Sequence, residues 1–540
     1  MRPSFIHRPI VISKNGLVAA GHHLASLAGI DILMKGGNAF DSAIATSAVL
    51  SVVRPHMTGL GGDAFALLFN AQSGGVEALN ASGPAPKAAS RQFFLDKGLT
   101  RIPLHGIYSV SVPGIVGCWG EISKKYGTIG LQELLKPAIQ YANRGFPVYP
   151  SLSLAIKEAG DKLANDRSAK EIFLRNGRAP LPGEILLQGD LARTLDMIAS
   201  KGTKSFYQGD IAKLIAEHFQ KQNGLLTQED LADYHSVWKP PIRTSYRGYT
   251  VLEQPPVSQG LILLQELNLV EGFDLAKLGH NAADSIHVMV EAKKLAFADR
   301  IGYLGDPDFV KVPLETLLSK EYAAKRSALI DVDRAMATTA KAGIDSMDSD
   351  TTYFAIVDRD GNAVSLIQSV FHSFGSGVVV DGTGVALNNR LSAFSLKSDH
   401  PNRLDPEKKT VHTLNSYMIM RDDSLFMVGG TPGADDQVQT NLQVIANILD
   451  YGMNVQEAIE APRWSSRPGT MPGEENLPYE LHVEDRISPQ VRDGLVKKGH
   501  DVRVGGGWSF AGAQAIIIDQ SNKVLMGGAD PRRDGYAIGW

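Results

Sequence analysis

Several classes of protein are excluded by what the 540-residue sequence lacks. It contains one cysteine, Cys118, and therefore no internal disulfide framework. Its 54 lysine and arginine residues are outnumbered by 58 acidic residues, and a net charge of −4 provides no basic surface of the kind that binds nucleic acid. Since Cys118 lies in an apolar run, we expect it to be a small buried core residue. The composition, 43% hydrophobic and 21% charged, is that of an ordinary globular protein.

The sequence also shows no targeting or membrane segment. No apolar stretch of signal-peptide length precedes the polar residues 13–16, and no membrane anchor is visible elsewhere. We therefore expect a cytoplasmic protein with neither a membrane nor a nucleic acid as partner.

Metal and nucleotide sites have no support in the residue spacing. The histidines show no recognised ligand spacing; they include His22, His23, His280 and His287. The glycine-rich stretches 374–377 and 505–507 lack the lysine and the serine or threonine that complete a phosphate-binding loop. We expect no metal and no cofactor.

The most informative stretch lies two-thirds of the way along the chain. Residues 351–357 alternate and are rich in β-branched and aromatic types, residues 360–361 are a tight-turn signal, and residues 363–370 supply a returning strand. The predicted hairpin has Thr351 at its mouth. A threonine hydroxyl is a poor nucleophile without a neighbouring base, and the α-amino group of Thr351 becomes that base only if its bond to Asp350 is cut. The stretch therefore suggests a self-cleaving proenzyme.

The remaining elements follow from apolar periodicity. Helical spacing is found over residues 24–34, 41–53, 131–142, 191–199, 281–299 and 437–450. Residues 246–253 predict one strand, and the polar residues 326–350 predict a flexible connection. Strands accompanied by helices in both halves favour a layered α/β architecture.

Several long motifs, in the right order, resemble the γ-glutamyltranspeptidase family. Residues 350–390 resemble the start of that family's small subunit, and other family motifs are matched by residues 36–43, 58–65, 111–114, 291–300, 430–433 and 461–464. The resemblance implies the four-layer αββα sandwich of the N-terminal nucleophile hydrolases. It also implies a large subunit of residues 1–350 and a small subunit of residues 351–540 that form a heterodimer, with the number of heterodimers per particle left open.

The resemblance assigns catalytic roles to particular residues. Thr351 is expected to be the nucleophile, and Ser369 to hydrogen-bond it and assist maturation. The backbone N–H groups of Gly433 and Ala434 would stabilise the oxyanion, with Ala434 standing where the family has a second glycine. The alternatives are that Ser369 is an ordinary strand serine and that the Gly433 turn is an ordinary helix start.

The substrate-binding positions depart from the family pattern. Ser82 stands where the family has an arginine for the substrate carboxylate, and Ala393 where it has an aspartate for the substrate ammonium. Arg390 is a new cation, which suits a carboxylate close to the scissile amide or forms a structural ion pair. Phe371 and His372 replace polar pocket residues.

Two further positions complete the predicted pocket. Asn389, next to Arg390, is expected to contact the substrate. The segment of residues 394–406 is shorter than the corresponding region in classical family members. The loop that acts as a lid there is expected to be absent, which would admit water and favour hydrolysis over transfer.

Together these features predict an autoprocessed threonine amidohydrolase that cleaves a γ-glutamyl-like or other small acidic amide without a cofactor. Glutathione-type hydrolysis is the family default. The alternatives are an oxamate amidohydrolase forming oxalate and ammonia, a cephalosporin acylase-like enzyme, and a non-catalytic binding protein on the same fold. Cleavage of the chain distinguishes an enzyme from a binder, and the released product distinguishes the enzymes.

Overall fold

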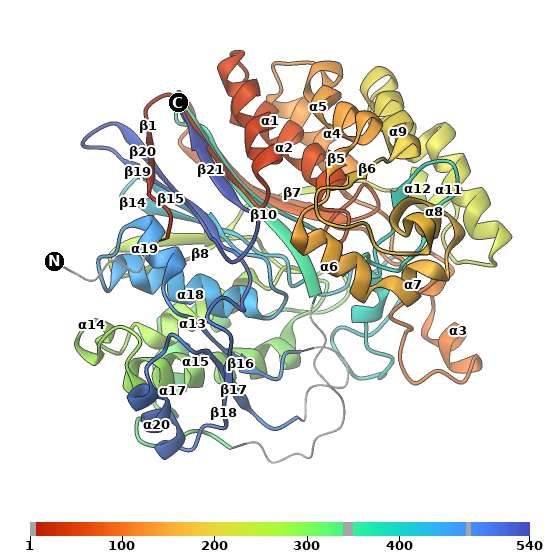
Figure 1. The fold of residues 1–540 in the computed structure, drawn as a ribbon. Coiled ribbons are helices and arrows are strands. Elements are labelled where there is room, and N and C mark those ends of the chain that lie inside the picture. Colours follow the sequence, from red (N-terminus) through yellow and green to blue (C-terminus); the bar gives the residue numbers. More distant parts are fainter. Residues whose placement is uncertain (1–6, 338–348, 471–476) are drawn as a thin grey trace.

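Two antiparallel sheets lie face to face between two layers of helices (Figure 1). The structure is a computed structural model that describes residues 7–337, 349–470 and 477–540, with only the backbone described at residues 349 and 350. None of the helices in these ranges combines the length and the apolar character needed to cross a membrane.

The first sheet, called the β10 sheet, holds the predicted hairpin. Its spatial order is β21 (Tyr536–Gly539), β2 (Gly16–Ala20), β10 (Ser349–Asp358), β11 (Ala363–His372), β3 (Asp63–Asn70), β4 (Gly75–Ala81) and β7 (Val237–Lys239). The hairpin prediction is confirmed. Its turn is stabilised by Asp358, whose Oδ1 accepts from the N–H groups of Asp360 and Asn362, and by Gly361 at φ +87°.

The second sheet, called the β14 sheet, faces the first. Its spatial order is β1 (Val11–Ser13), β20 (Val524–Ala529), β19 (Gln514–Asp519), β15 (Ser424–Gly430), β14 (Tyr417–Arg421), β9 (Tyr249–Glu253) and β8 (Ile242–Tyr246). Each sheet combines strands from before residue 350 with strands from after it, so neither part of the chain forms a sheet alone.

Alternation along β10 explains the layers. Tyr353, Ala355 and Val357 point into the core between the two sheets. Phe354 and Ile356 point the other way, into the core beneath the helices. Because both faces are covered, every one of these side chains is buried, and complete burial of a large apolar side chain contributes about 1.5–3 kcal/mol.

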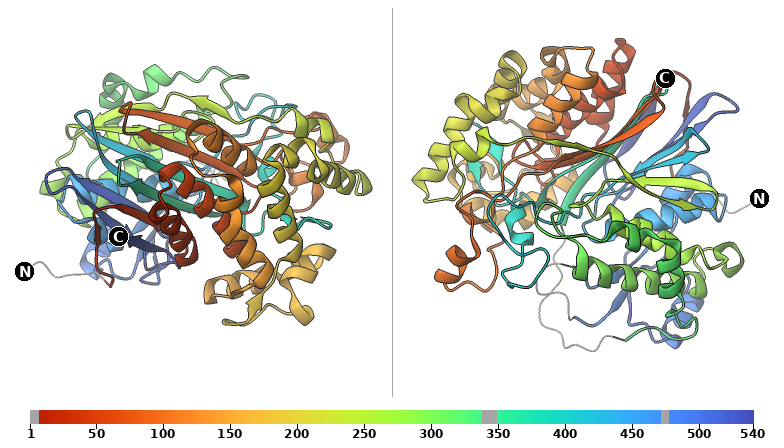
Figure 2. Two further views of the ribbon diagram at one scale, coloured as in Figure 1. Left: turned by 90° about the horizontal axis from the view of Figure 1, so that it is seen from above. Right: turned by 180° about the vertical axis from the view of Figure 1, so that it is seen from behind.

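The helices form the outer layers, which Figure 2 shows on opposite sides of the stacked sheets. The β10 sheet is covered by α1 (His23–Met34), α2 (Ala39–Val53) and α4 (Ile115–Tyr126), with α5 (Leu131–Arg144) and α9 (Gly189–Lys201) packed outside them. The β14 sheet is covered by α13 (Gly260–Val270), α18 (Asp436–Leu449) and α19 (Val455–Glu460), with α15 (Ala283–Tyr303) packed on α13. The helices predicted from periodicity are confirmed as α1, α2, α5, α9, α15 and α18.

Shorter elements complete the described chain. The helices are α3 (Arg91–Asp96), α6 (Pro150–Glu158), α7 (Gly160–Ala164), α8 (Arg167–Phe173), α10 (Lys204–Gln208), α11 (Asp210–Lys221), α12 (Gln228–Ala232), α14 (Leu275–Leu278), α16 (Leu314–Leu318), α17 (Lys320–Ser327), α20 (Pro489–Lys497) and the 3₁₀ turns η1 (Ile107–Ser109), η2 (Arg175–Gly177) and η3 (Arg390–Ala393). The small sheets contain β5 (Phe146–Pro147), β6 (Ile185–Leu186), β12 (Val379–Val380), β13 (Val385–Ala386), β16 (Trp464–Arg467), β17 (Glu480–Glu484) and β18 (Val502–Gly505).

The structure divides one predicted strand and describes only part of one predicted connection. The single strand predicted over residues 246–253 is confirmed over residues 249–253, which form β9, but it is wrong before them, because Arg247 and Gly248 have φ values of +50° and +83° and turn the chain between β8 and β9. The Arg247 side chain is held by Asp450 and by backbone carbonyls, which keeps a non-glycine residue in this conformation. The connection predicted over residues 326–350 begins inside α17, and its residues 338–348 lie outside the described residues.

Cys118 is buried in α4, as predicted. It has no exposed surface, and burial raises the pKa of its thiol to about 12. Because the thiolate is the reactive form, we expect no reaction with a thiol-specific colorimetric reagent in the folded protein and one equivalent after unfolding in guanidinium. A native protein that reacts at once would contradict this burial.

Candidate active site

Thr351 lies on an irregularity at the mouth of the hairpin. The register of the ladder shifts between Asp350, which pairs with Phe371, and Thr352. The hydroxyl of Thr351 donates to the Oγ of Ser369 on the neighbouring strand at 3.3 Å, and both side chains are fully buried. Such bulges re-aim a side chain and are common beside active sites. The fold therefore presents the threonine hydroxyl to a second hydroxyl.

A buried acid that sequence reasoning did not single out lies next to this pair. Asp63, the first residue of β3, is the ladder partner of Ser369. Its Oδ1 accepts from the N–H of Gly83 at 3.0 Å, and its Oδ2 accepts from the Nε of Arg390 at 3.2 Å. Burial raises the pKa of Asp63 to about 6, although Arg390 opposes the shift. In the sequence, Asp63 is indicated only by its place in the family motif over residues 58–65.

Arg390 is fully buried and only partly paired. Its guanidinium carbon lies 4.0 Å from the centre of the Phe371 ring, and burial lowers the pKa of Arg390 to about 10. Within the described part of the chain, Nη1 and Nη2 have no hydrogen-bond partner. The same holds for both ring nitrogens of His412, whose Nε2 is 3.9 Å from Asp63. Burial lowers the pKa of His412 far below its usual value, so its ring is neutral.

The turn between β15 and α18 lies close to the start of β10. A Cβ added to Gly430, at the end of β15, would come within 2.7 Å of the Tyr353 ring. Gly433 and Ala434 follow with φ values of +122° and +52°. Among the described residues, no acceptor takes the N–H of either Gly433 or Ala434. Two such N–H groups at a helix start are the donors from which an oxyanion hole is built.

Polar side chains hold this turn in place. Gln259 Nε2 donates to the carbonyl of Ala434 at 3.0 Å, and Arg300 donates to Gln259 Oε1 and pairs with Asp435. The N–H of Thr470 donates to Asp435 Oδ2 at 2.7 Å. Burial alone would raise the pKa of Asp435, but Arg300 and Thr470 hold it below its usual value. These contacts fix an alanine in the left-handed region that glycine favours.

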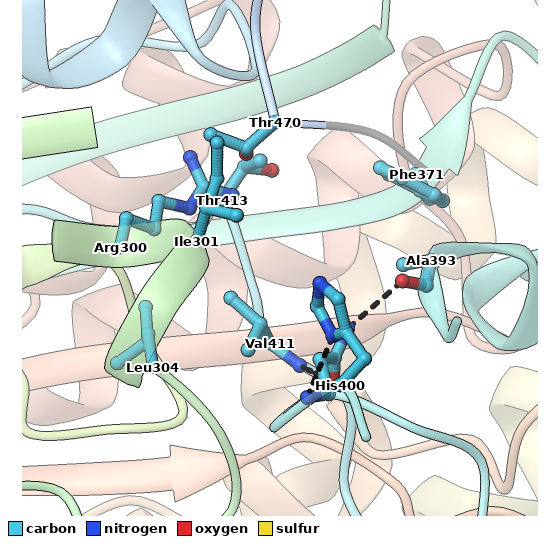
Figure 3. A pocket seen from close by; sticks show the side chains of 10 residues that line it. Arg300, Ile301, Leu304, Phe371, Ala393, His400, Val411, Thr413 and Thr470 are labelled. Atoms are coloured by element: carbon cyan, nitrogen blue, oxygen red, sulfur yellow. Dashed lines mark hydrogen bonds between the residues drawn. The ribbon is translucent and has the colours of Figure 1, made fainter. Parts of the chain in front are cut away.

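A small pocket, with a cavity volume of about 30 Å³ and partly open to solvent, lies beside these residues (Figure 3). It is lined by Arg300, Ile301, Leu304, Phe371, Ala393, His400, Asn402, Val411, Thr413 and Thr470. Figure 3 shows Phe371 and Ala393 on one side and Arg300 on the other. The Arg390 guanidinium stacks on Phe371, has no exposed surface and is not among the residues that line the pocket.

Comparison with known proteins decides the family. The sequence model described as Gamma-glutamyltranspeptidase matches residues 25–540. The chain belongs to the gamma-glutamyltranspeptidase family. It is 43% identical over 533 residues to the "Glutathione hydrolase-like YwrD proenzyme" of Bacillus subtilis, covering 98% of this chain and 99% of the relative. It is 37% identical over 547 residues to the "Glutathione hydrolase proenzyme" of Escherichia coli, covering 97% and 91%.

Solved structures agree. A cephalosporin acylase from Bacillus halodurans matches with a TM-score of 0.92 at 39% identity, covering 100% of this chain and 98% of that one. A gamma-glutamyltranspeptidase chain from Helicobacter pylori matches with a TM-score of 0.59 at 38% identity, covering 61% of this chain and 95% of that one. The family resemblance, the four-layer N-terminal nucleophile hydrolase fold and the assignment as an enzyme, all predicted from the sequence, are confirmed.

The other positions singled out in the family pattern have different surroundings. The hydroxyl of Ser82 donates to Asn80 Oδ1 at 2.7 Å and is fully buried. Asn389 and His372 are joined by two contacts. Asn389 Oδ1 accepts from the backbone N–H of His372 at 3.1 Å, and the side-chain nitrogen of Asn389 lies 2.9 Å from His372 Nδ1. Neither Ser82, Asn389 nor His372 is among the residues that line the pocket. Their predicted contact with substrate stays a prediction.

One group of side chains has the composition of a metal site. His287, Glu291 and His500 place a possible ligand atom each within 4.8 Å of the others. These atoms already have partners: His287 Nδ1 lies 2.8 Å from His500 Nε2, and Glu291 Oε1 accepts from Lys294 Nζ at 2.7 Å. A metal ion would have to displace the Lys294 ammonium, so the group is a satisfied polar cluster. Sequence spacing missed it because His500 is distant in the chain.

We expect Ser369→Ala to slow maturation. The substitution removes the hydroxyl that positions Thr351, and one such hydrogen bond contributes about 0.5–1.5 kcal/mol, equivalent to roughly twofold to thirteenfold in rate. The measurement is the appearance of two fragments with time on a denaturing gel. Ser365→Ala is the matched control, because Ser365 is a buried serine of the same strand that contacts Tyr353. Equal rates for both variants would remove the role of Ser369.

Proposed function

We propose that this gamma-glutamyltranspeptidase family member is a proenzyme that cuts its own chain between Asp350 and Thr351. The mature enzyme then hydrolyses a small acidic amide through an ester on Thr351. The observation that carries the proposal is the buried Thr351 hydroxyl, placed by a bulge 3.3 Å from Ser369. The names of the relatives from Bacillus subtilis and Escherichia coli, which describe proenzymes, support it.

The chemistry needs no cofactor. In maturation the Thr351 hydroxyl attacks the carbonyl carbon of Asp350, the peptide nitrogen leaves as the new α-amine of Thr351, and water hydrolyses the ester. In turnover that amine takes the hydroxyl proton while Oγ attacks the substrate amide. The proton passes to the leaving amine, and water then releases the acid. The N–H groups of Gly433 and Ala434 would stabilise the oxyanion of both tetrahedral intermediates.

The two products would be a large subunit of residues 1–350 and a small subunit of residues 351–540. They would stay together as a heterodimer, because strands from both parts alternate in both sheets. A further observation supports the division. The Helicobacter pylori chain spans 61% of this chain, close to the 350 of 540 residues that precede Thr351.

The substrate class follows from the charges near Thr351. Ser82 and Ala393 bring no charge to the positions where the family binds an amino-acid zwitterion, whereas Arg390 brings a buried cation. A carboxylate would match it. The second candidate is therefore oxamate hydrolysis to oxalate and ammonia, since oxamate carries a carboxylate directly beside its amide. Glutathione is the first candidate by family, and a cephalosporin amide follows from the solved acylase.

Purified protein tests the proposal directly. In proportion to its residues, the 58.2 kDa chain should yield fragments of roughly 38 and roughly 20 kDa, with Thr351 at the amino terminus of the smaller. A denaturing gel, intact mass and N-terminal sequencing give the answer. The mature protein is then assayed for ammonia from oxamate and for glutamate from glutathione. A chain that stays uncut after long incubation would favour a non-catalytic binding protein on the same fold.

A further inference from the structure

We propose that cleavage at Asp350–Thr351 uncovers a carboxylate-binding subsite formed by Nη1 and Nη2 of Arg390, which Phe371 covers in the uncut chain. The inference rests on the proposed cleavage and narrows its substrate class. The ligand is a short carboxylate whose negative charge lies within a few bonds of the carbonyl that Thr351 attacks.

The subsite is built around a fixed guanidinium. Arg390 is completely buried; its Nε donates to Asp63 at 3.2 Å, and its backbone N–H donates to Asn388 Oδ1 at 2.9 Å. These contacts and the Phe371 ring leave the side chain little freedom. In the part of the chain that the structure describes, its two outer nitrogens have no partner. Buried donors without acceptors are costly, and a carboxylate matches a pair of guanidinium nitrogens with two oxygens.

The surroundings favour an anion. His412 lies beside Asp63, the carboxylate that also pairs with Arg390. Its Nε2 is 3.9 Å from Asp63 Oδ2, and its ring nitrogens have no hydrogen-bond partner among the described residues. As a neutral imidazole it can turn one N–H toward a ligand. Lys409 also acts electrostatically on Asp63. Burial already raises the pKa of Asp63 to about 6, so this acid accepts a proton readily when a second negative charge arrives.

Phe371 separates this cation from the pocket. Phe371 lines the pocket, and its ring stacks on the guanidinium of Arg390, which is not itself a lining residue. Its φ of +84° is a strained conformation for a large non-glycine residue. Two backbone contacts restrain this φ, namely the ladder pairing with Asp350 and the hydrogen bond from the Phe371 N–H to Ser369 Oγ at 2.7 Å, while the ring packs against Arg390 and His372.

Cleavage removes one of these two restraints. Asp350 pairs with Phe371 because β10 continues through the Asp350–Thr351 bond. Once that bond is cut, Asp350 is a chain end and no longer held in register by the rest of the strand. Phe371 is then released from its ladder pairing, and a relaxed φ moves the ring away from Arg390. Thr351 and Arg390 have no exposed surface in the uncut chain, so one event would open both.

The nucleophile and the cation are linked through one side chain. Ser369 Oγ lies 3.3 Å from Thr351 Oγ1 and accepts from Phe371 N–H, and its ladder partner Asp63 holds Arg390. A carboxylate on Arg390 would therefore lie close to the attacked carbonyl. This geometry favours acyl groups that carry a carboxylate near the attacked carbonyl.

Calorimetric titration with sodium oxalate tests the subsite. We expect mature wild-type protein to bind oxalate, mature Arg390→Gln to bind at least tenfold more weakly, and Arg359→Gln to match the wild type. Arg359 is the control because it is an exposed arginine at the far tip of the same hairpin. Equal affinity of wild type and Arg390→Gln would overturn the subsite.

Variants that cannot be cleaved test whether Phe371 covers the Arg390 subsite. Thr351→Ala protein should not bind oxalate, whereas Thr351→Ala with Phe371→Gly should bind, since glycine removes the ring and accepts a positive φ. Phe371→Asn replaces the glycine variant if that protein does not fold, and adding Arg390→Gln should abolish the gain. Oxalate binding by Thr351→Ala alone would overturn the masking. If wild-type protein stays uncut, the proposed cleavage fails, but the Phe371 variants still report on the Arg390 subsite.

Discussion

Thr351→Ala is expected to leave a single chain of 58.2 kDa without amidase activity. Alanine removes the only hydroxyl that the bulge presents to Ser369, so both maturation and turnover lose their nucleophile. Loss of a nucleophile in a comparable hydrolytic site lowers the rate by about 10⁴-fold or more. The measurement is a denaturing gel after days of incubation, followed by an assay for released ammonia or glutamate.

Two neighbouring substitutions make this result specific. Thr351→Ser keeps a hydroxyl at the same position and should yield the two fragments, more slowly. Thr352→Ala removes the next hydroxyl, which is buried and has no partner among the described residues, and should cut as fast as the wild type. Two fragments from Thr351→Ala would show that the nucleophile is another residue or that a protease makes the cut.

Arg300→Met is expected to have the second largest effect. It leaves the buried Asp435 carboxylate without its ion pair, which costs about 3–5 kcal/mol of unfolding free energy. It also removes the donor to Gln259 Oε1, and since Gln259 holds the Ala434 carbonyl, the predicted oxyanion donors lose part of their support. Loss of one such donor lowers the turnover number by about 10²–10³-fold. Chemical denaturation and steady-state kinetics measure the two effects.

A second substitution separates stability from catalysis. Arg300→Met with Asp435→Asn removes the unpaired charge and should regain most of the unfolding free energy, while the turnover number stays low. Arg167→Met is the surface control, because the exposed ion pair of Arg167 with Glu171 contributes about 0–1 kcal/mol. Recovery of activity together with stability in the double variant would show that Arg300 acts on the fold alone.

Local patterns predicted the elements of this fold well. The hairpin of β10 and β11 and the helices α2 and α18 follow from alternation, helical spacing and a turn signal, each set within a short stretch. The strand predicted over residues 246–253 began too early because alternation continues across the Arg247–Gly248 turn, where a positive φ on arginine leaves no sequence signal.

The site could be predicted only in part, because its contacts are between distant residues. Thr351 and Ser369 were found since they share a hairpin, and the resemblance supplied their roles. The ion pair of Asp63 with Arg390 joins residues 327 positions apart, and the strained Phe371 depends on its neighbours in three dimensions. No periodicity records such contacts, so the sequence alone does not decide whether Arg390 forms an ion pair or binds a ligand, and it does not single out Asp63 within its motif.

Because the β10 sheet interleaves strands from before and after Thr351, the proposed cleavage would change how the protein folds and unfolds. β2 and β3 come from before Thr351, while the strands between them, β11 and all of β10 except Ser349 and Asp350, come from Thr351 onward. The sheet must therefore assemble while the chain is continuous and its parts are held at a high effective concentration. If the chain is cut as proposed, unfolding would separate two molecules, and recovery would become a second-order reaction that slows on dilution. Maturation would thus exchange reversible folding for a long-lived state guarded by its unfolding barrier.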